Sequence, residues 1–430
     1  MHPRRRLRPL LAGVVLPVVL GACLVTAETS DAPDSSTAAE TAGPTPTVAP
    51  TPTPDPTLEM PLAVVTGYTA VTAGITLDAV TAARDSILVP CGVTEYLGIS
   101  VTSATGCPSA ADIADRLNSA PPDHPLLALL PPSLVAPNVK VLPVDGADLF
   151  GGPLVRSKPY PIIGRAIGIE PYDPGRIRTL MSLGDSCPDR GVAYAAITLG
   201  RGWDWVFGGG TASYTRVYPN PAPPGHVGNG FNIVDAVPTD NAGAMAALVS
   251  DADVTLDDFE CPVVNDWTVN NGVVFSIDPA VLPRLRDTYG VDVATLAANH
   301  LFDRGTTGFL ETLQQFRDAG IPTAGAGADL DAALEPAYVD ADGVRFGFVA
   351  FNEVPGSLEA GPNQPGVLWL RDANVTAAVS RARTGGADIV ICVPQWWGGS
   401  EYHDDWRGDM RRQQEVFFDA GCDHVLGHGT

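Results

Sequence analysis

Residues 291–305 read VDVATLAANHLFDRG, an apolar run that ends at the pair Asn299-His300. A short run rich in Val, Leu and Ala predicts a buried strand. Asp303 and Gly305 follow within a few residues and are typical of a turn. An amide and an imidazole at the mouth of a buried strand suggest a metal site. The alternative is an ordinary turn whose histidine is satisfied by its neighbours.

An apolar strand followed by polar residues is a pattern that repeats along the second half of the chain. Strand-like runs alternate there with helix-like stretches, several of which end at glycine. This alternation predicts a layered α/β domain over residues 177–430. The predicted strands are residues 178–185, 252–260, 291–299, 344–352, 387–395 and 423–429, and the predicted helices are residues 241–252, 278–290, 306–320, 373–386 and 410–421.

Side chains able to bind a metal stand at the ends of five of these strands. Because ligands in open α/β sheets bind just outside the carboxyl ends of the strands, we expect these side chains to converge on one crevice. Carboxylate, amide and imidazole together suit one or two divalent ions of Mn, Zn or Fe. Each residue alone could also be a plain strand end or a satisfied core histidine. The residues are Asp185, Glu260, Asn299 with His300, Gln395 and His428.

The first 58 residues have the composition of a secretion signal and a tether. Arginines precede the apolar run Leu10–Leu20, and the sequence LGAC ends at Cys23. This layout predicts a lipoprotein signal peptide over residues 1–23, with Cys23 lipidated, although an ordinary signal peptide with an incidental cysteine is the alternative. Residues 24–58 are rich in Pro, Thr and Ser and predict a disordered linker. The chain is therefore expected to be an extracytoplasmic, membrane-anchored lipoprotein.

Charge and cysteine content narrow the functional classes. The 26 basic and 49 acidic residues give a net charge of −23, which argues against nucleic acid as a partner. Export would permit disulfides, and six of the seven cysteines lie beyond Cys23. Six cysteines allow about fifteen pairings. We favour pairing of neighbours along the chain, as Cys91–Cys107, Cys187–Cys261 and Cys392–Cys422.

Residues 59–172 are expected to form a smaller accessory α/β domain whose role is unknown. Several apolar runs surround one helix-like stretch, SAADIADRLNSA. His124 is the only histidine in this region, and no phosphate loop or nucleophile motif accompanies it. The chemistry is therefore expected in residues 177–430.

Five motifs in that second region together resemble a known family. They are GDSCPDRGV, DDFECPV, LAANHLFDRG, QWWGGSEY and GCDHVLGHG, in this order along the chain. The set is similar to the capsule-synthesis proteins called CapA, or PgsA in polyglutamate systems. Their usual pattern is a GD strand end with a downstream Arg, then NLE, ANNH, HWG.EY and a GHHPH-like close. The resemblance covers about residues 177–430 and implies a calcineurin-like metallophosphatase fold.

The resemblance also implies roles for individual residues. Asp303 would orient His300, the preferred acid/base group, and Arg190 would meet an anionic group of the substrate. The metal ligands would be Asp185, Glu260, Asn299, His300 and His428, and the substrate pocket would be lined by Gln395, Glu401, Tyr402 and Asp258.

Three departures from the family pattern stand out. Asp258 replaces the family's Asn and would be either an extra ligand or a repulsive neighbour. Gln395 replaces the HWG histidine, so it offers an amide oxygen without a titratable nitrogen. The chain stops at Gly427-His428-Gly429-Thr430, within the last motif. We therefore expect the sequence to be incomplete at its C-terminus.

Three functional hypotheses follow. The first is a surface lipoprotein whose metal-dependent hydrolase or transferase domain acts in making, attaching or releasing an anionic extracellular polymer such as poly-γ-glutamate. The second is a non-catalytic accessory protein that binds the polymer or its membrane synthase. The third is a lipoprotein that captures a small ligand for transport through residues 59–172.

Overall fold

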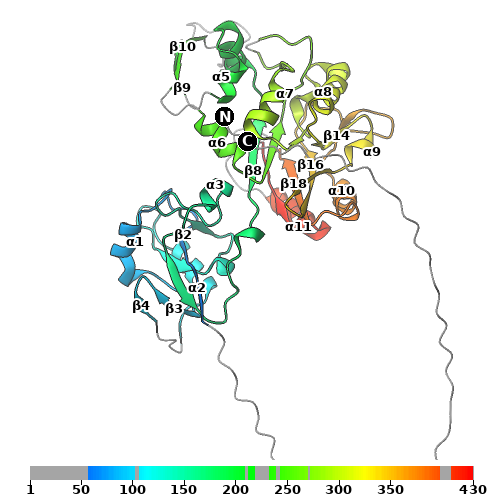
Figure 1. Ribbon diagram of the computed structural model, residues 1–430. Helices are drawn as coiled ribbons and strands as arrows, with labels where there is room; N and C mark the ends of the chain where they lie inside the picture. The colour runs from blue at the N-terminus through cyan, green and yellow to red at the C-terminus, as the bar shows by residue number, and fades with distance from the viewer. Residues whose placement is uncertain are drawn as a thin grey trace, which may run out of the picture. The chain divides into compact units, whose positions relative to one another are not determined.

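The computed structural model of the chain describes residues 57–101, 106–208, 212–217, 232–238, 243–269, 272–397 and 408–429 (Figure 1). Cys23, almost all of the predicted linker, Glu401, Tyr402 and Thr430 lie outside these residues, so the predictions made for them stay predictions. No helix in the described ranges has both the length and the apolar character needed to cross a membrane.

Residues 58–176 contain two antiparallel sheets and short helices. One sheet has the strand order β1-β7-β3-β4 and the other β5-β2-β6. Helix α2 is capped by Ser109, whose hydroxyl accepts from Asp112 N while the Asp112 carboxylate accepts from Ser109 N, a capping box. The bounds are β1 Leu58–Pro61, β2 Ala63–Gly67, α1 Leu77–Ala83, η1 Arg84–Ser86, β3 Val93–Tyr96, β4 Ile99–Ser100, α2 Ala110–Asn118, β5 Ala128–Leu130, η2 Pro132–Leu134, β6 Val139–Val141, α3 Pro153–Arg156, β7 Ile163–Ala166 and η3 Pro174–Arg176. The division into two domains near residues 172–177 stays a prediction.

Residues 180–429 hold two larger sheets of four strands each. The first is parallel, in the order β13-β12-β11-β8, and the second has the order β15-β16-β18-β19 with only β15 antiparallel. Two-stranded pairs β9-β10 and β14-β17 accompany them. The strands are β8 Leu180–Ser186, β9 Ala212–Val217, β10 Asn232–Pro238, β11 Val254–Phe259, β12 Val293–Thr295, β13 Thr323–Ala324, β14 Ala326–Gly327, β15 Ala337–Ala341, β16 Val344–Asn352, β17 Gly366–Val367, β18 Ile389–Gln395 and β19 His424–Val425.

Helices flank these two sheets and cover their outer faces. The elements are α4 Arg190–Ala193, η4 Tyr194–Thr198, α5 Trp203–Gly208, α6 Ala244–Ser250, α7 Val281–Arg284, η5 Leu285–Tyr289, η6 Asn299–Phe302, α8 Gly305–Ala319, α9 Leu330–Ala333, α10 Asp372–Thr384 and α11 Gly408–Ala420. Each of the six predicted strands and five predicted helices has a counterpart here, so the predicted layered α/β class is confirmed. Several elements were not predicted, among them strand β15 and helices α4 and α5.

The core shows why the strands are apolar on both sides. Phe346 and Phe348 of β16 pack in a cluster that the two sheets share, whereas Val349 and Phe351 pack with α10 and α11 on the opposite face. Successive side chains of a strand point to opposite faces, so a strand buried on both faces has an almost continuous apolar sequence. The first sheet is covered in the same way by α7 and α8. The architecture is therefore helix, sheet, sheet, helix.

The described residues contain three disulfides, with the pairing of neighbours that we favoured from the sequence. Cys91–Cys107 lies among the strands of the first region, Cys187–Cys261 joins the segments after β8 and β11, and Cys392–Cys422 joins β18 to the segment before β19.

Candidate metal centre

The polar strand ends meet where the two large sheets come together. Gln395, at the end of β18, accepts a hydrogen bond from Asn299 N at 3.0 Å through Oε1. Its Nε2 donates to Asn299 Oδ1 at 3.0 Å and to Glu260 Oε1 at 3.3 Å. These bonds join the end of the second sheet to loops that follow β11 and β12 of the first. The site thus lies between two sheets rather than along the edge of one.

A compact group of Asp185, Asp258 and His428 lies beside this junction. His428 Nδ1 is 2.9 Å from Asp185 Oδ1 and 2.8 Å from Asp258 Oδ2. Thr295 Oγ1 donates to the other oxygen of Asp258 at 2.6 Å. Each of the three residues has a ligand atom within 4.8 Å of the ligand atoms of the other two, a spacing that one ion could bridge.

A bulge in β8 places Asp185 at this position. Asp257 pairs with Leu183 and Phe259 pairs with Ser186, so β8 has one residue more than β11 over this stretch. Such a bulge re-aims a side chain at the end of a strand. Asp185 has a φ of +49°, a left-handed conformation that is uncommon for a residue with a Cβ atom.

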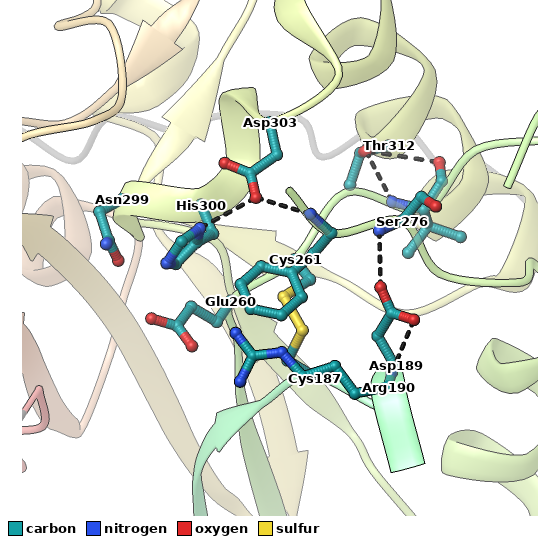
Figure 2. Close-up of a disulfide and its surroundings, with 12 residues drawn as sticks. Cys187, Asp189, Arg190, Glu260, Cys261, Ser276, Asn299, His300, Asp303 and Thr312 are labelled. Atoms are coloured by element: carbon teal, nitrogen blue, oxygen red, sulfur yellow. Dashed lines mark hydrogen bonds and ion pairs between the residues drawn. A yellow bond between two sulfur atoms is a disulfide. The ribbon is translucent and has the colours of Figure 1, made fainter. Parts of the chain in front are cut away.

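The predicted pair Asn299-His300 begins the short helix η6, and Asp303 contacts the His300 ring. The carboxylate of Asp303 accepts from Phe275 N at 2.8 Å and lies 2.9 Å from His300 Nδ1 (Figure 2). The Phe275 ring meets the His300 ring edge to face, with the ring centroids 4.6 Å apart. Contact with a carboxylate fixes the orientation of an imidazole, as the sequence led us to expect for Asp303.

Arg190 also contacts Phe275. Its guanidinium carbon is 4.3 Å from the centroid of the Phe275 ring, and its Nε donates to Gly272 O at 3.0 Å. Only one of the five N–H groups of the guanidinium is used in that bond. Stacking on the ring holds the cation in place without neutralising its charge.

A cavity of about 190 Å³ lies between these groups. Asp258 is buried and is not among the lining residues, so in this structure it contacts His428 rather than the cavity. Phe275, Val354, Trp396 and Trp397 also line the cavity, and none of them was predicted as a site residue. The two tryptophans belong to the motif QWWGGSEY, whereas Phe275 and Val354 lie outside all five motifs. The full lining is Asp185, Arg190, Glu260, Phe275, Asn299, His300, Val354, Gln395, Trp396, Trp397 and Gly429.

Burial and charge together shift several pKa values at the site. Burial raises the pKa of Glu260 to about 7, and the charge of Asp185 adds to this shift. Burial alone would lower the pKa of His428, but Asp258 and Asp185 outweigh it and raise that pKa to about 10. The hydrogen bond with His428 lowers the pKa of Asp185. Without a metal, the site therefore keeps protons near neutral pH that a cation would displace.

The residues present fit a divalent ion. His428 Nε2 is buried and has no hydrogen-bond partner among the described residues, while Nδ1 on the same ring contacts carboxylates. That division of roles between the two ring nitrogens is typical of metal-ligating histidines. Glu260 and Asn299 supply further oxygen ligands at the cavity wall. Carboxylates, an amide oxygen and imidazole suit Mn, Zn or Fe.

Several known proteins are similar to part of this chain. "Capsule biosynthesis protein CapA" of Bacillus anthracis is 26% identical over 194 residues, which are 43% of this chain and 46% of that protein. "PGA biosynthesis protein CapA" of Bacillus subtilis is 33% identical over 138 residues, 32% of this chain and 36% of that protein. A "probable polyglutamine synthesis accessory protein" of Mycobacterium tuberculosis is 33% identical over 201 residues, 44% of this chain and 52% of that protein.

These matches cover about half or less of each relative's length. The sequence model of one family, described as "Bacterial capsule synthesis protein PGA_cap", matches residues 179–430, more than half of the chain and all of the described site. The chain therefore belongs to the PGA_cap family of bacterial capsule synthesis proteins.

Proposed function

We propose that residues 179–430 form a metal-dependent hydrolase or transferase that acts in the synthesis, attachment or release of an anionic capsule polymer of the poly-γ-glutamate type. The convergence of Asp185, Glu260, Asn299 and His300 on one cavity, with His428 bonded to Asp185, is the observation that carries this proposal. The names of the relatives point to the same class of polymer.

One or two divalent ions would be held by Asp185, Glu260, Asn299, His300 and His428, with Asp258 as a neighbouring carboxylate. A bound ion would supply Lewis-acid polarisation of an acyl or phosphoryl group and activation of water. His300, oriented by Asp303, can take one of two roles: it holds an ion, or it moves a proton at the cavity wall. Arg190, fixed on Phe275, can bind a carboxylate or phosphate of the substrate.

Local positive charge matters because the whole chain carries a net charge of −23. This surplus repels a polyanion at long range. A divalent ion and Arg190 would offset the repulsion at the cavity itself, so recognition of the polymer depends on the site being loaded.

The test is a metal and activity measurement on the full chain. We expect purified protein to contain a stoichiometric divalent metal and to turn over a γ-glutamyl or phosphoester substrate. Asp185→Ala should lose the metal and His300→Ala the activity. His124→Ala is the matched control, because His124 is exposed and lies in the first region of the chain. Retention of both metal and activity in Asp185→Ala and His300→Ala would refute the proposal.

A binding role without catalysis is the second candidate, and Gln395 favours it. The amide oxygen of Gln395 is occupied by Asn299 N, so Gln395 does not stand in for a histidine ligand. In this case the chain would bind the polymer or its membrane synthase, with unchanged affinity after chelation of metal. Polymer binding that disappears on chelation would instead support the enzyme.

We further propose that the chain acts at the cell surface and is anchored through a lipid on Cys23. The LGAC sequence supports this location. Cys23→Ser should move the protein from the membrane fraction to the soluble fraction in its own host, and an unchanged distribution would exclude the lipid anchor.

A further inference from the structure

The disulfide Cys187–Cys261 joins the two segments that carry the candidate carboxylate ligands. Cys187 lies two residues after Asp185, and Cys261 directly follows Glu260. The Cα atoms of the two cysteines are 5.4 Å apart (Figure 2). Any change in the separation of these cysteines would therefore be passed on to Asp185 and Glu260.

The disulfide stands where backbone pairing between β8 and β11 ends. Phe259 pairs with Ser186, and Glu260 N donates to Ser186 O at 3.0 Å. Cys187 directly follows Ser186, and Cys261 directly follows Glu260. Because the bulge in β8 interrupts the ladder just before this point, only a short paired stretch lies beyond it. The disulfide closes that stretch covalently.

The segment around Cys187 has an unfavourable backbone on both sides. Asp185 and Arg190 both have a φ of +49°. Such conformations in non-glycine residues persist only where the surroundings fix them. Asp189, which is buried, accepts from Arg190 N at 2.7 Å and from Ser276 N at 3.0 Å. The segment is thus held at Cys187 by the disulfide and at Asp189 by hydrogen bonds.

The segment after Cys261 returns to the same site. Cys261 is fully buried, and Val263 N donates to Thr312 Oγ1 of helix α8 at 2.9 Å. Further along, Phe275 N reaches Asp303 and Ser276 N reaches Asp189. The disulfide is therefore the covalent part of a network of contacts around the cavity wall. The hydrogen bonds of this network hold the segments next to Arg190 and His300.

We propose that Cys187–Cys261 is a positioning element of the metal centre, which fixes Asp185 and Glu260 at a separation that one site can use. This inference rests on the proposed function. Without the disulfide, segment 185–190 can relax away from Glu260. Binding of a metal would then have to bring the ligands back together, and the free-energy cost of this step would lower the affinity. Disulfides persist in oxidising compartments, so the centre would reach full affinity only after export.

The test compares two disulfide-free variants in the full chain. Cys187→Ala/Cys261→Ala removes the disulfide next to the metal centre. Cys91→Ala/Cys107→Ala removes a disulfide in the first region of the chain and is the matched control. Calorimetric titration of each metal-free protein with Mn²⁺ and Zn²⁺ gives the affinity, and urea unfolding gives the stability. Loss of supports behind metal ligands typically weakens binding by about 10–100-fold. We expect such a loss in the first variant and a change within about threefold in the control, although both lose stability.

A purely structural role predicts a different result. The first variant would then unfold more easily but bind metal with the affinity of the wild type while folded, and the inference would be overturned. Cys392–Cys422 is unsuitable as the control because Cys392 lies in β18, close to Gln395.

Two further measurements keep the outcomes separate. If the double alanine variant does not fold, Cys187→Ala/Cys261→Val, which refills the buried space, is titrated in its place. If this variant also fails to fold, wild-type protein is reduced with a phosphine, freed of it and titrated without air, and unchanged affinity overturns the inference. A wild type that binds neither ion disproves the proposed metal function, whereas equal binding by wild type and variant disproves only the role of the disulfide.

Discussion

Gln395 connects the two sheets at the site through one side-chain amide. It is 2% exposed, and its three hydrogen bonds reach Asn299 N, Asn299 Oδ1 and Glu260 Oε1. In the family pattern this position is a histidine. The amide satisfies buried groups on the neighbouring loops, which is a structural role that an exposed glutamine would not have.

We predict that Gln395→Leu destabilises the metal-free protein by about 1–3 kcal/mol, because it leaves the buried Asn299 N–H without its acceptor. Urea unfolding followed by circular dichroism measures the change. Gln364→Leu is the control, since Gln364 is exposed and its side chain donates to Glu359 O, a bond outside the site. An unchanged midpoint in Gln395→Leu would mean that the contacts to Asn299 contribute nothing.

Asp303 supports His300 and the Phe275 backbone together, through the same carboxylate oxygen. If His300 is a metal ligand, Asp303→Asn should weaken metal affinity by about 10–100-fold, since the charge behind the imidazole is lost. Titration calorimetry measures this. Asp266→Asn serves as the control, because Asp266 is exposed and forms its ion pair with Arg304, away from His300. Equal affinities of the two variants would place His300 outside the metal ligands.

Sequence patterns predicted which residues form the site better than they predicted how those residues contact one another. Asp185 lies at the end of β8, and Asn299 and His300 come shortly after β12, so the strand-end rule placed all three at one cavity. The contact of His428 with Asp185 could not be foreseen, because periodicity does not tell which of two sheets a buried strand joins. Phe275 was missed because it lies in a loop without any periodic pattern, and it becomes visible only through its contacts with Arg190 and His300.

At the level of elements, β15 is the strand that sequence analysis missed although a signal was present. Asp342-Gly343 joins β15 to β16, and both residues have positive φ values, 45° and 87°. Asp-Gly in a two-residue turn of this kind is a strong hairpin signal. Strands β11, β12, β16 and β18 were predicted correctly because they are almost wholly buried and so have apolar runs.

We predict that Gly343→Ala destabilises the protein by about 1–2 kcal/mol, the cost of a left-handed conformation for a residue with a Cβ atom. An added Cβ at Gly343 meets no atom within 4 Å, so steric overlap is not the cause. Gly74→Ala is the control, because Gly74 has no left-handed φ and its nearest neighbour to an added Cβ, Pro143 O, is 3.5 Å away. Thermal unfolding measures both. Equal shifts would show that the turn geometry is not the reason for the glycine.

At the scale of the whole molecule, buried titratable groups at and near the site make the stability of the fold depend on pH. Burial raises the pKa of Glu260 to about 7 from 4.5, and burial raises the pKa of Asp257 to about 8 from 3.8. Against the effect of burial, Asp258 and Asp185 raise the pKa of His428 to about 10 from 6.5. Each group binds its proton more tightly in the folded state than in the unfolded chain, so each contributes stability that is lost as pH rises.

We therefore predict that the melting temperature of the metal-free protein falls as pH rises from 6 to 9. Glu260 loses its contribution by about pH 7, Asp257 by about pH 8, and His428 continues to lose it up to about pH 10. The lowered pKa of Asp185 has the opposite sign, but it acts below 3.8, outside this range. Glu260→Gln should flatten the fall between pH 6 and 7.

Because a divalent ion takes the place of the protons, saturating Mn²⁺ should stabilise the protein more at pH 9 than at pH 6. Differential scanning calorimetry at fixed ionic strength measures both effects, and metal stabilisation that is independent of pH would show that the ion does not bind at the protonated groups.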